Sequence, residues 1–466
     1  MSLLVMKFGG TSVGSTAAIE GVAAITRAQL QEWDHVVVVV SAMSGVTDML
    51  LSGAHLAAAG KGDAYRELAA TLREKHNAAL AELVSNQADS ATVGAQIGRM
   101  IDEFELLCRS IHVLGEASPR ALDAIASLGE RMSARLVAAT LRARGLRAEA
   151  VDATELIITT DQFGSAVPLH AQTRVLTRAR LGPLLEQGVV PVITGFIGAT
   201  EAGVTTTLGR GGSDYSGAII GAVLDADEVA IYTDVDGVMT TDPRLAPDAQ
   251  ILPELSYTEM GELAYFGAKV LHPRTVRPVV ERGIALRIRN TFNPSHPGTL
   301  IVPQSTPDGR TVKAVALIRN MSMITVGGRG MIGVPGIAAR TFGAVASADA
   351  NVLMISQASS EQSICFVVPM ASSAVVVRAL EEWLSKELER RDIDRIVAQD
   401  GVVIVTAVGA GMRETPGVAS SIFGALGGQG INVIAIAQGS SECSISIVVA
   451  GADGDAAVRA IHRLTV

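Results

Sequence analysis

The sequence predicts an α/β protein whose mainly parallel sheet is followed by two copies of a smaller strand–helix module. Apolar, β-branched runs alternate with helical patterns through roughly the first 300 residues, and strands of this kind are buried on both faces of a parallel sheet. Roughly the last 150 residues contain a repeat at a constant offset of 81. Segments that start at Gly330 and Gly411 share 19 identities in 39 positions, which indicates a duplicated module.

The expected strands of the first part are Leu3–Phe8, Val36–Ser41, Arg147–Asp152, Val189–Phe196, Glu228–Thr233 and Ile284–Arg289. Helical patterns between them include Ser15–Gln31 and a long stretch from Ala64 to Leu114. From residue 290 onward a segment rich in Pro, Asn, Ser and Gly indicates a domain boundary. We therefore expect domains over residues 1–300, 314–396 and 400–466. A module as small as each repeat should pair with its copy.

Composition narrows the possible functions. The 466 residues carry 38 Lys and Arg against 47 Asp and Glu, a net charge of −9, and this balance disfavours nucleic-acid binding. Three scattered cysteines, Cys108, Cys365 and Cys443, favour a reducing compartment without structural zinc. The first residues lack a signal-peptide pattern, and their longest apolar run is too short to span a membrane. We expect a cytoplasmic protein that contacts neither nucleic acid nor membrane.

Two glycine-rich loops are candidates for anion binding. The first, Lys7–Ser12, follows an apolar strand and precedes a helix, so its backbone N–H groups and the Lys7 charge can meet a phosphate. An ordinary strand–turn–helix corner explains it about equally well, and no Walker motif is present. The second loop, Thr205–Asp214, offers Arg210 to a carboxylate or phosphate. Asp214 by itself is explained equally by a cap on the helix Tyr215–Leu224.

Three further segments carry charged residues. Tyr232–Arg244 places carboxylates at the end of a strand, where open α/β sheets bind ligands, and its spacing fails to match a calcium loop. Phe266–Pro273 contains Lys269 and His272, and for His272 a capping or core role is favoured over catalysis. In the helical Ser127–Ser133 segment, Glu130 and Arg131 would ordinarily form a solvated face.

The motifs KFGGTS, VVVVSAMSGVTD, SLGERMS, TGFIG, TTTLGRGGSDYS, YTDVDGVMTTDPR and FGAKVLHP, in this order, resemble the motif series of aspartokinases. The repeated tail resembles the paired ACT regulatory domains of the same family, so the resemblance runs from Lys7 to about Val449. It implies an amino-acid-kinase-type αβα sandwich followed by two ferredoxin-like (βαββαβ) ACT domains. It also implies the reaction of L-aspartate with ATP to give 4-phospho-L-aspartate and ADP, the first step towards lysine, threonine and methionine.

The resemblance also implies roles for single residues. Lys7 would stabilise the transferring phosphoryl group and Asp214 would orient Lys7, while Arg210 would bind the substrate α-carboxylate and Glu130 its ammonium. The other implied aspartate-site residues are Ser41, Thr47, Phe196, Gly211, Gly212 and Ser213. The implied nucleotide-site residues are Lys7, Phe8, Gly9, Gly10, Thr233, Asp234, Met239, Arg244, Lys269 and Val270, with Mg²⁺ bridging phosphates and no protein metal site. Met239 departs from relatives that carry an aromatic residue there.

Elementary chemistry agrees with these implied roles. A substrate carboxylate with a pKa of about 4 is ionised at neutral pH, so the reaction requires no protein base. The site must instead hold two anions together and neutralise the charge that develops between them.

In the tail, the resemblance places an amino-acid effector around Gly336, Ile337, Asn351, Val352 and Gln357, with Gly417, Asn432 and Gln438 as the equivalents in the second copy. These positions can also be read as sheet packing, and the second copy as purely structural. Leu353 replaces an acidic residue that lysine-regulated relatives often carry, which favours threonine over lysine. No GxGxxG nucleotide domain follows, so we expect a monofunctional kinase, and ACT pairing implies a homodimer or homotetramer.

Two alternatives remain open at this stage. One is a different amino-acid kinase, such as a glutamate or carbamate kinase, against which the GRGGSDY loop and the twin repeat argue. The other is a catalytically inactive amino-acid sensor, against which the presence of Lys7, Glu130, Arg210, Asp214 and Lys269 argues.

Overall fold

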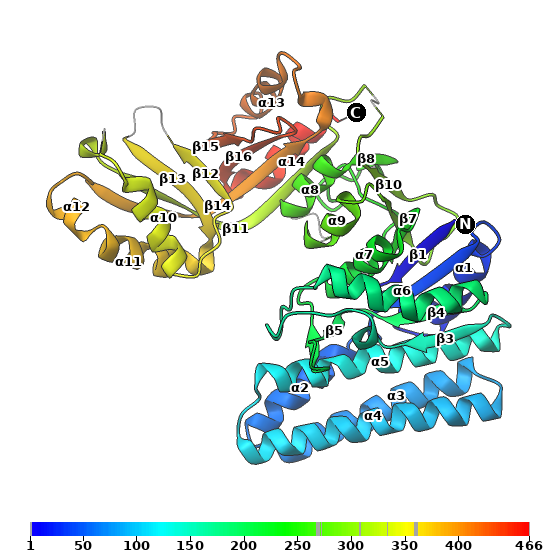
Figure 1. Ribbon diagram of the computed structural model, residues 1–466. Coiled ribbons are helices and arrows are strands. Elements are labelled where there is room, and N and C mark those ends of the chain that lie inside the picture. Colours follow the sequence, from blue (N-terminus) through cyan, green and yellow to red (C-terminus); the bar gives the residue numbers. More distant parts are fainter. Residues whose placement is uncertain are drawn as a thin grey trace. The chain divides into compact units, whose positions relative to one another are not determined.

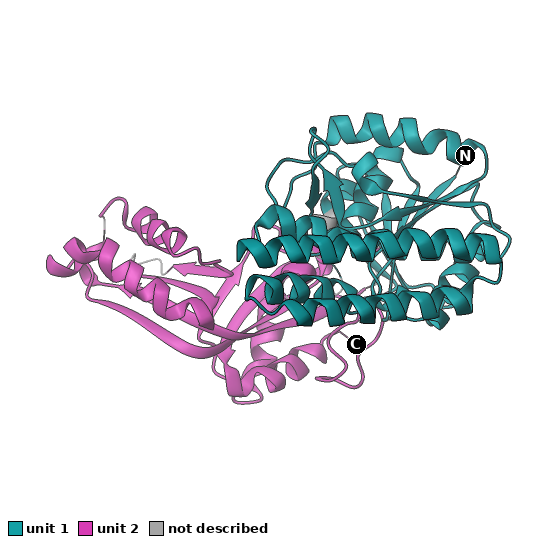
Figure 2. Ribbon diagram, turned by 90° about the horizontal axis from the view of Figure 1, so that it is seen from below, with its two compact units in different colours: residues 1–238, 253–257, 270–305 teal, residues 239–252, 258–269, 306–466 magenta. Residues whose placement is uncertain are grey.

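The computed structural model describes residues 2–266, 271, 273–306, 309–332, 334–357 and 362–465. The chain forms two compact units (Figure 2). Unit 1 contains Met1–Val238, Pro253–Tyr257 and Val270–Ser305, and unit 2 contains Met239–Leu252, Thr258–Lys269 and Thr306–Val466. Unit 1 ends close to the boundary expected near residue 300. Two segments of the expected first domain, 239–252 and 258–269, nevertheless belong to unit 2.

Unit 1 is built on an eight-stranded sheet (Figure 1). In spatial order its strands are β3 (Ala148–Val151), β4 (Val190–Thr194), β2 (His35–Val40), β1 (Leu3–Phe8), β7 (Glu228–Thr233), β9 (Ala285–Asn290), β10 (Thr299–Val302) and β8 (Glu254–Ser256). All neighbouring pairs are parallel except β9 with β10. The six expected strands are all present, which confirms the mainly parallel sheet. A small hairpin of β5 (Ile197–Ala199) and β6 (Thr205–Thr207) accompanies it.

Helices cover both faces of this sheet. They are α1 (Thr16–Gln29), α2 (Val46–Ala58), α3 (Gly62–Leu83), α4 (Gln87–Leu114), α5 (Pro119–Ala143), α6 (His170–Glu186), α7 (Gly212–Leu224) and α9 (Pro273–Val280). Helices α1 and α5 pack on strands together with α2, α3 and α4, whereas α6 and α7 pack together on β4 and β1. Within the part of the chain that the structure describes, no helix is both long and apolar enough to cross a membrane.

The stretch Ala64–Leu114, expected to be helical, is divided into α3 and α4, which lie side by side (Figure 1). The division falls before Asn86, whose side chain accepts hydrogen bonds from the N–H groups of Ala88 and Asp89. An Asn side chain in this position satisfies the free donors at a helix start and therefore begins a new helix. The hydrophobic pattern alone could not show this break.

Unit 2 is built on a six-stranded antiparallel sheet. Its strands, in spatial order, are β12 (Met354–Gln357), β13 (Ser363–Pro369), β11 (Ala314–Gly327), β14 (Arg395–Val408), β16 (Ser444–Ala450) and β15 (Ala435–Gln438). Its helices are α10 (Ile337–Ser347), α11 (Ser373–Trp383), α12 (Ser385–Glu389), α13 (Val418–Gly427) and α14 (Gly454–His462), and most of α8 (Tyr257–Tyr265) also belongs to it. Both repeats contribute to this one sheet, as expected for modules that pair.

The two modules share their long central strands. The second half of β11 packs in a core with α10, α11 and Ile396 of β14, whereas Val315, in its first half, joins the core of α13 and α14. A register shift between Ile318 and Ser322 separates the two halves of β11. The second module is therefore completed by a strand that precedes the first module in the sequence. The expected domain ranges 314–396 and 400–466 do not include this sharing of β11 between the two modules.

Candidate active site

A pocket of roughly 790 Å³ lies in unit 1 at the carboxyl ends of β1, β2 and β7. It is lined by Lys7, Gly9, Gly10, Thr11, Ser41, Ala42, Met43, Ser44, Gly45, Thr47, Asp48, Glu130, Phe196, Gly209, Arg210, Gly211, Gly212, Ser213, Asp214, Thr233 and Asp234. Carboxyl strand ends are where open α/β sheets bind ligands, because the loops that follow the strands meet there. Residues of both glycine-rich loops line this pocket.

The Lys7 ammonium forms an ion pair with the Asp214 carboxylate at this pocket. Lys7 is the penultimate residue of β1, and its side chain is only 8% exposed. Its methylene groups run along α7, where a Cβ added to Gly217 would lie 3.1 Å from the Lys7 Cβ. Helix α7 is capped by the backbone of Gly211, so Asp214 is not the cap that one interpretation of the sequence suggested. It lies in the first turn and holds Lys7.

Two helices begin at the pocket without a side-chain cap. Gly45 starts α2 with φ of 79° and Gly211 starts α7 with φ of 71°. The first N–H of each helix donates to the carbonyl of Met43 or Gly209, and no side chain among the described residues accepts from the next two N–H groups. Such free donors, together with the helix dipole, attract anions. Because both φ values are positive, a side chain at either glycine would be strained. The pocket thus presents backbone donors from two directions.

Glu130 is the buried carboxyl group of the pocket. It is 3% exposed, its Oε1 accepts the N–H of Ala42 at 3.3 Å, and its Oε2 has no hydrogen-bond partner among the described residues. Burial raises its pKa to about 8, although the Ala42 N–H and the Lys7 charge oppose the shift. The expectation of a solvated face was therefore wrong for Glu130. A bound cationic group would meet the free oxygen and ionise the carboxyl.

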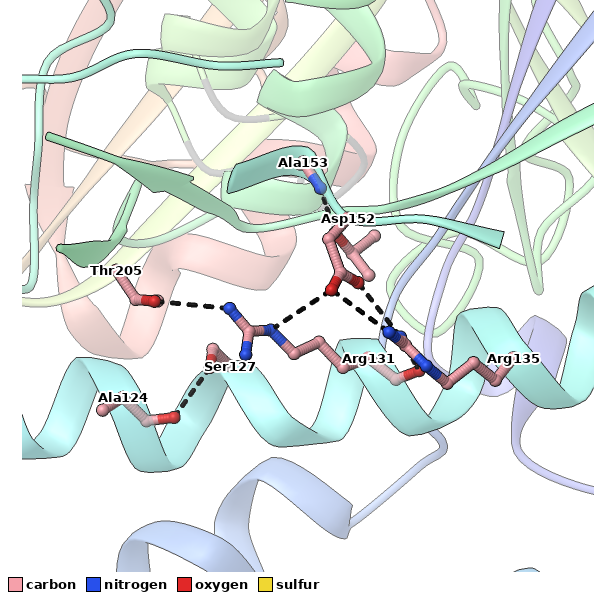
Figure 3. A network of polar contacts seen from close by, with 8 residues as sticks. Ala124, Ser127, Arg131, Arg135, Asp152, Ala153 and Thr205 are labelled. Atoms are coloured by element: carbon pink, nitrogen blue, oxygen red, sulfur yellow. Dashed lines mark hydrogen bonds and ion pairs between the residues drawn. The ribbon is translucent and has the colours of Figure 1, made fainter. Parts of the chain in front are cut away.

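The same expectation was also wrong for the next residue, Arg131. Its guanidinium lies 3.9 Å from the Asp152 carboxylate and donates to Thr205 at 3.3 Å (Figure 3). Arg135 binds the same carboxylate through two nitrogens at 3.0 and 3.2 Å. This cluster joins α5 to β6, the strand that leads into the Arg210 loop. The structural role of such a half-buried arginine cannot be predicted from the fact that its side chain is polar.

The floor of the pocket depends on close backbone packing. Phe196 has a positive φ of 67°, and its N–H donates to the Ser216 hydroxyl of α7 at 2.9 Å. A Cβ on Gly212 would lie 2.7 Å from the Phe196 ring, and one on Gly195 would lie 2.8 Å from Ser213. The start of α7 is thereby fixed against the β4–β5 turn. This packing brings Phe196, Gly212 and Ser213 together as the resemblance implied.

The structure brings most of the predicted residues together, with identifiable exceptions. The pocket contains all of the implied aspartate-site residues, and also Lys7, Gly9, Gly10, Thr233, Asp234 and Asp214. The Phe8 side chain instead lies fully buried below it, stacked on Tyr232 with ring centroids 4.6 Å apart. Met239 and Arg244 belong to unit 2, where exposed Arg244 binds Asp242 through its guanidinium. Lys269, Val270 and His272 lie outside the described residues.

Several lining residues were missed by the sequence reasoning. Ser44, Gly45 and Asp48 belong to the quoted SAMSGVTD motif, of which only Ser41 and Thr47 were selected. The Ser-Gly pair before a helical pattern was the available signal, because it predicts a helix start without a strong side-chain cap. Gly209 and Thr11 were also missed, although both lie inside glycine loops already singled out.

The predicted effector residues lie at equivalent corners of the two modules in unit 2. Gly336 and Gly417 each precede a helix with φ of 90° and 89°, again without a side-chain cap. Gln357 and Gln438 end the edge strands β12 and β15, which lie against each other. Ile337 is buried behind Gly336, and exposed Asn351 precedes Val352, whose carbonyl accepts the Tyr265 hydroxyl at 3.2 Å. Asn432 is the exposed equivalent of Asn351.

Comparison with known proteins agrees with this architecture. Residues 2–290 match the amino acid kinase family, and residues 324–384 and 405–464 match an ACT domain. The bifunctional aspartokinase/homoserine dehydrogenase 1 of Arabidopsis thaliana is 40% identical over 99% of this chain and 51% of its own length. Aspartokinase 3 of the same plant is 33% identical over 98% of this chain and 80% of its own length. The chain thus spans about half the length of the bifunctional relatives.

Among solved structures, aspartokinase III of E. coli in complex with aspartate and ADP (R-state) has a TM-score of 0.81 and 30% identity, covering 99% of both chains. Its complex with lysine and aspartate (T-state) has a TM-score of 0.78 and 31% identity. Fold and pocket therefore define a member of the amino acid kinase family with attached ACT domains. Within that family, the chain belongs to the aspartokinases.

Proposed function

We propose that the chain catalyses the ATP-dependent phosphorylation of the L-aspartate side-chain carboxylate, giving 4-phospho-L-aspartate and ADP. The observation that carries this proposal is the charge arrangement of the pocket. A lysine and uncapped helix starts suit phosphates, and a buried carboxyl with a free oxygen suits an ammonium. The pocket, of roughly 790 Å³, has room for the ammonium and the α-carboxylate of an amino acid beside a polyphosphate. The complex of aspartokinase III with aspartate and ADP supports the same pair of ligands.

In the proposed mechanism, the substrate carboxylate attacks the γ-phosphorus of ATP. A bond forms between the carboxylate oxygen and phosphorus while the bond from phosphorus to the ADP oxygen breaks. The attacking group is already ionised, so no proton has to move. Lys7, held by Asp214, neutralises the charge on the transferring group, and the N–H of Gly10 assists, whereas the N–H of Gly9 donates to the Tyr232 carbonyl at 3.1 Å. Arg210 binds the α-carboxylate and Glu130 the ammonium.

We assign Mg²⁺ to the phosphates of ATP. The residues that the structure describes include no group of three His, Cys, Asp or Glu side chains that could hold a metal by themselves. Mg²⁺ is commonly bound through substrate phosphates with only one or two carboxylates, and Asp234 at the pocket wall is available for that purpose. When bound, the ion would offset phosphate charge. Met239, Arg244, Lys269 and Val270 remain proposed nucleotide residues on the resemblance alone.

We propose that the ACT modules inhibit the kinase when an end-product amino acid binds, threonine being favoured over lysine. Leu353 cannot pair with the side-chain ammonium of lysine. Bifunctional aspartokinase/homoserine dehydrogenases are 36–40% identical to the chain, against 32–33% for the chloroplastic aspartokinases 1 and 3. Lysine is bound by aspartokinase III in its T-state, so lysine is the second candidate. We further propose a cytoplasmic homodimer or homotetramer that associates through the ACT domains.

The test of this function is ADP release from the purified chain with ATP, Mg²⁺ and L-aspartate, repeated with L-glutamate. We expect turnover that depends on aspartate and is at least tenfold slower with glutamate, because the extra methylene displaces the attacking carboxylate. Added threonine should inhibit at lower concentration than added lysine. Turnover with another amino acid alone would establish a different kinase. Amino-acid binding without any turnover would establish an inactive sensor.

A further inference from the structure

Each of the three consecutive threonines of β6 is fixed by a different partner. The Thr205 hydroxyl accepts from Arg131 (Figure 3), and the Thr206 hydroxyl lies 2.7 Å from that of Thr159. Thr207 donates to Asp123 twice, from its N–H at 2.9 Å and from its hydroxyl at 2.7 Å. Because Arg131 and Asp123 both belong to α5, this helix holds β6 at both ends. Strand β6 leads directly into the loop that carries Arg210.

Asp123 is a buried carboxylate that no sequence motif and no role described above includes. It is 3% exposed, and no cation pairs with it among the described residues. Besides Thr207, it accepts the N–H of Gly164 with both oxygens, at 2.9 and 3.1 Å. A buried charge without a counterion is retained only where several donors converge on it. Asp123 therefore fixes two chain segments at once, the end of β6 and the Gly164 turn.

Both segments adjoin the Arg210 loop, β6 in the sequence and the Gly164 turn in space. Gly209 has φ of 76°, and a Cβ added there would lie 3.1 Å from the Gly164 carbonyl oxygen. Arg210 itself is exposed and makes no hydrogen bond or ion pair within the described chain. Its position over the pocket is therefore set by the backbone of its loop, and that backbone is held by Asp123.

Asp123 and Glu130 lie on one face of α5, since residues two helical turns apart share a face. Glu130 lines the pocket directly, whereas Asp123 acts on the pocket through the Arg210 loop. We propose that Asp123 is a positioning residue that keeps Arg210 in register with Glu130 and thereby sets the affinity for the amino-acid substrate. This proposal rests on the proposed function, in which those two side chains bind the α-carboxylate and the ammonium.

The test is the variant Asp123→Asn, in which an amide NH₂ must face one of the three donors. We expect the KM for aspartate to rise at least tenfold, while kcat and the KM for ATP change less than threefold. In an Arg210→Ala background, Asp123→Asn should add less than threefold, because the residue through which it acts is gone. Thr207→Val, which removes only the hydroxyl, should raise the KM for aspartate by a smaller factor.

The matched control is Asp89→Asn, which removes a bidentate pair between Asp89 and Arg142 of the same helix α5, away from β6. It should leave both KM values unchanged. Equal changes in both KM values with Asp123→Asn, or effects that multiply with Arg210→Ala, would overturn the proposal. If Asp123→Asn fails to fold, an unchanged KM for aspartate in Thr207→Val would overturn it. Wild-type protein without aspartate turnover would instead overturn the proposed function on which it rests.

Discussion

The ammonium of Lys7, on the central strand β1, is paired with the carboxylate of Asp214, in the first turn of α7. A lysine chain has four rotatable carbons, and the partner restricts it to one direction at the mouth of the pocket. The ion pair thus fixes the position of an ammonium group that would otherwise be mobile.

We first predict that Lys7→Ala lowers kcat by at least 10³-fold, because the charge on the transferring phosphoryl group is then not offset. Asp214→Asn should lower kcat by about 10- to 100-fold and leave the KM for aspartate almost unchanged, since the lysine remains but is free to turn away. Steady-state kinetics with both variants measure this. A larger fall in kcat for Asp214→Asn than for Lys7→Ala would contradict the assignment of Lys7 as the catalytic cation and of Asp214 as the residue that positions it.

The second prediction concerns Glu130 and pH. Its pKa is raised from 4.5 to about 8, so the ligand-free protein holds a proton that the unfolded chain releases. Its contribution to stability is therefore complete below pH 4.5 and is lost as the pH rises through about 8. Glu130→Gln, which imitates the protonated form, should become progressively more stable than wild type between pH 6 and pH 9. Denaturant titrations at three pH values test this, and parallel curves would contradict it.

The same group predicts the pH dependence of substrate affinity. An ammonium binds the ionised carboxylate best, so the KM for aspartate in the wild type should fall between pH 6.5 and pH 8.5. The limit is about tenfold per pH unit for a single titrating group. Glu130→Gln should bind aspartate weakly at every pH in this range. If Glu130→Gln kept the wild-type pH dependence of the KM for aspartate, a group other than Glu130 would be responsible for it.

A third prediction concerns the contact between α7 and β1. Gly217→Ala places a methyl group 3.1 Å from the Lys7 Cβ, so the lysine must shift by a few tenths of an ångström. We expect kcat to fall about tenfold, because small misplacement of a catalytic charge is costly. The control is Gly182→Ala in α6, where an added Cβ meets nothing within 4 Å. This control should retain full activity, although it gains no stability, because Pro183 disfavours helical backbone at an alanine that precedes it.

The fourth prediction concerns a buried ion pair in unit 2. Lys313 and Glu259 of α8 are 4% and 0% exposed, with Nζ 3.3 Å from Oε1, and Glu259 also accepts the Ala410 N–H at 2.7 Å. Lys313→Met should destabilise unit 2 by about 3–5 kcal/mol, since it removes a buried cation that lies against a buried carboxylate. Arg319→Met, which breaks an exposed pair with Asp455, should cost less than about 1 kcal/mol. Equal losses in thermal unfolding would contradict the argument from burial.

Much of the fold could be predicted because its signals are local. The strands of unit 1 are nearly continuous apolar runs, and the duplicated module is visible as identities at one offset. Residues of both glycine-rich loops line the pocket, whereas Ser41, Thr47, Phe196 and Glu130 were selected on the family resemblance and not on a local pattern. The assignment of segment 239–252 to unit 2 could not, because its anchors are distant. Thr240, for example, bonds to the buried His462 near the end of the chain at 2.8 Å.

Other features depended on long-range contacts that carry no local pattern. Nothing in the sequence around Asp123 shows that its carboxylate will meet Thr207 and Gly164. Glu130 and Arg131 are adjacent and both polar, yet one faces a pocket and the other an ion-pair cluster. The exchange of β11 between the two modules likewise depends on pairing with β14 and not on residue type.

The central claim is that the unit 1 pocket transfers a phosphoryl group from ATP to the side chain of aspartate. Its most direct test is ³¹P NMR of the product formed by the purified chain with ATP, Mg²⁺ and L-aspartate, with hydroxylamine trapping as a second readout. We expect, without hydroxylamine, an acyl phosphate resonance that grows with ADP and that Lys7→Ala forms at least 10³-fold more slowly. ADP and inorganic phosphate formed without any aspartyl hydroxamate when hydroxylamine is present, or an acyl phosphate formed by Lys7→Ala at the wild-type rate, would contradict it.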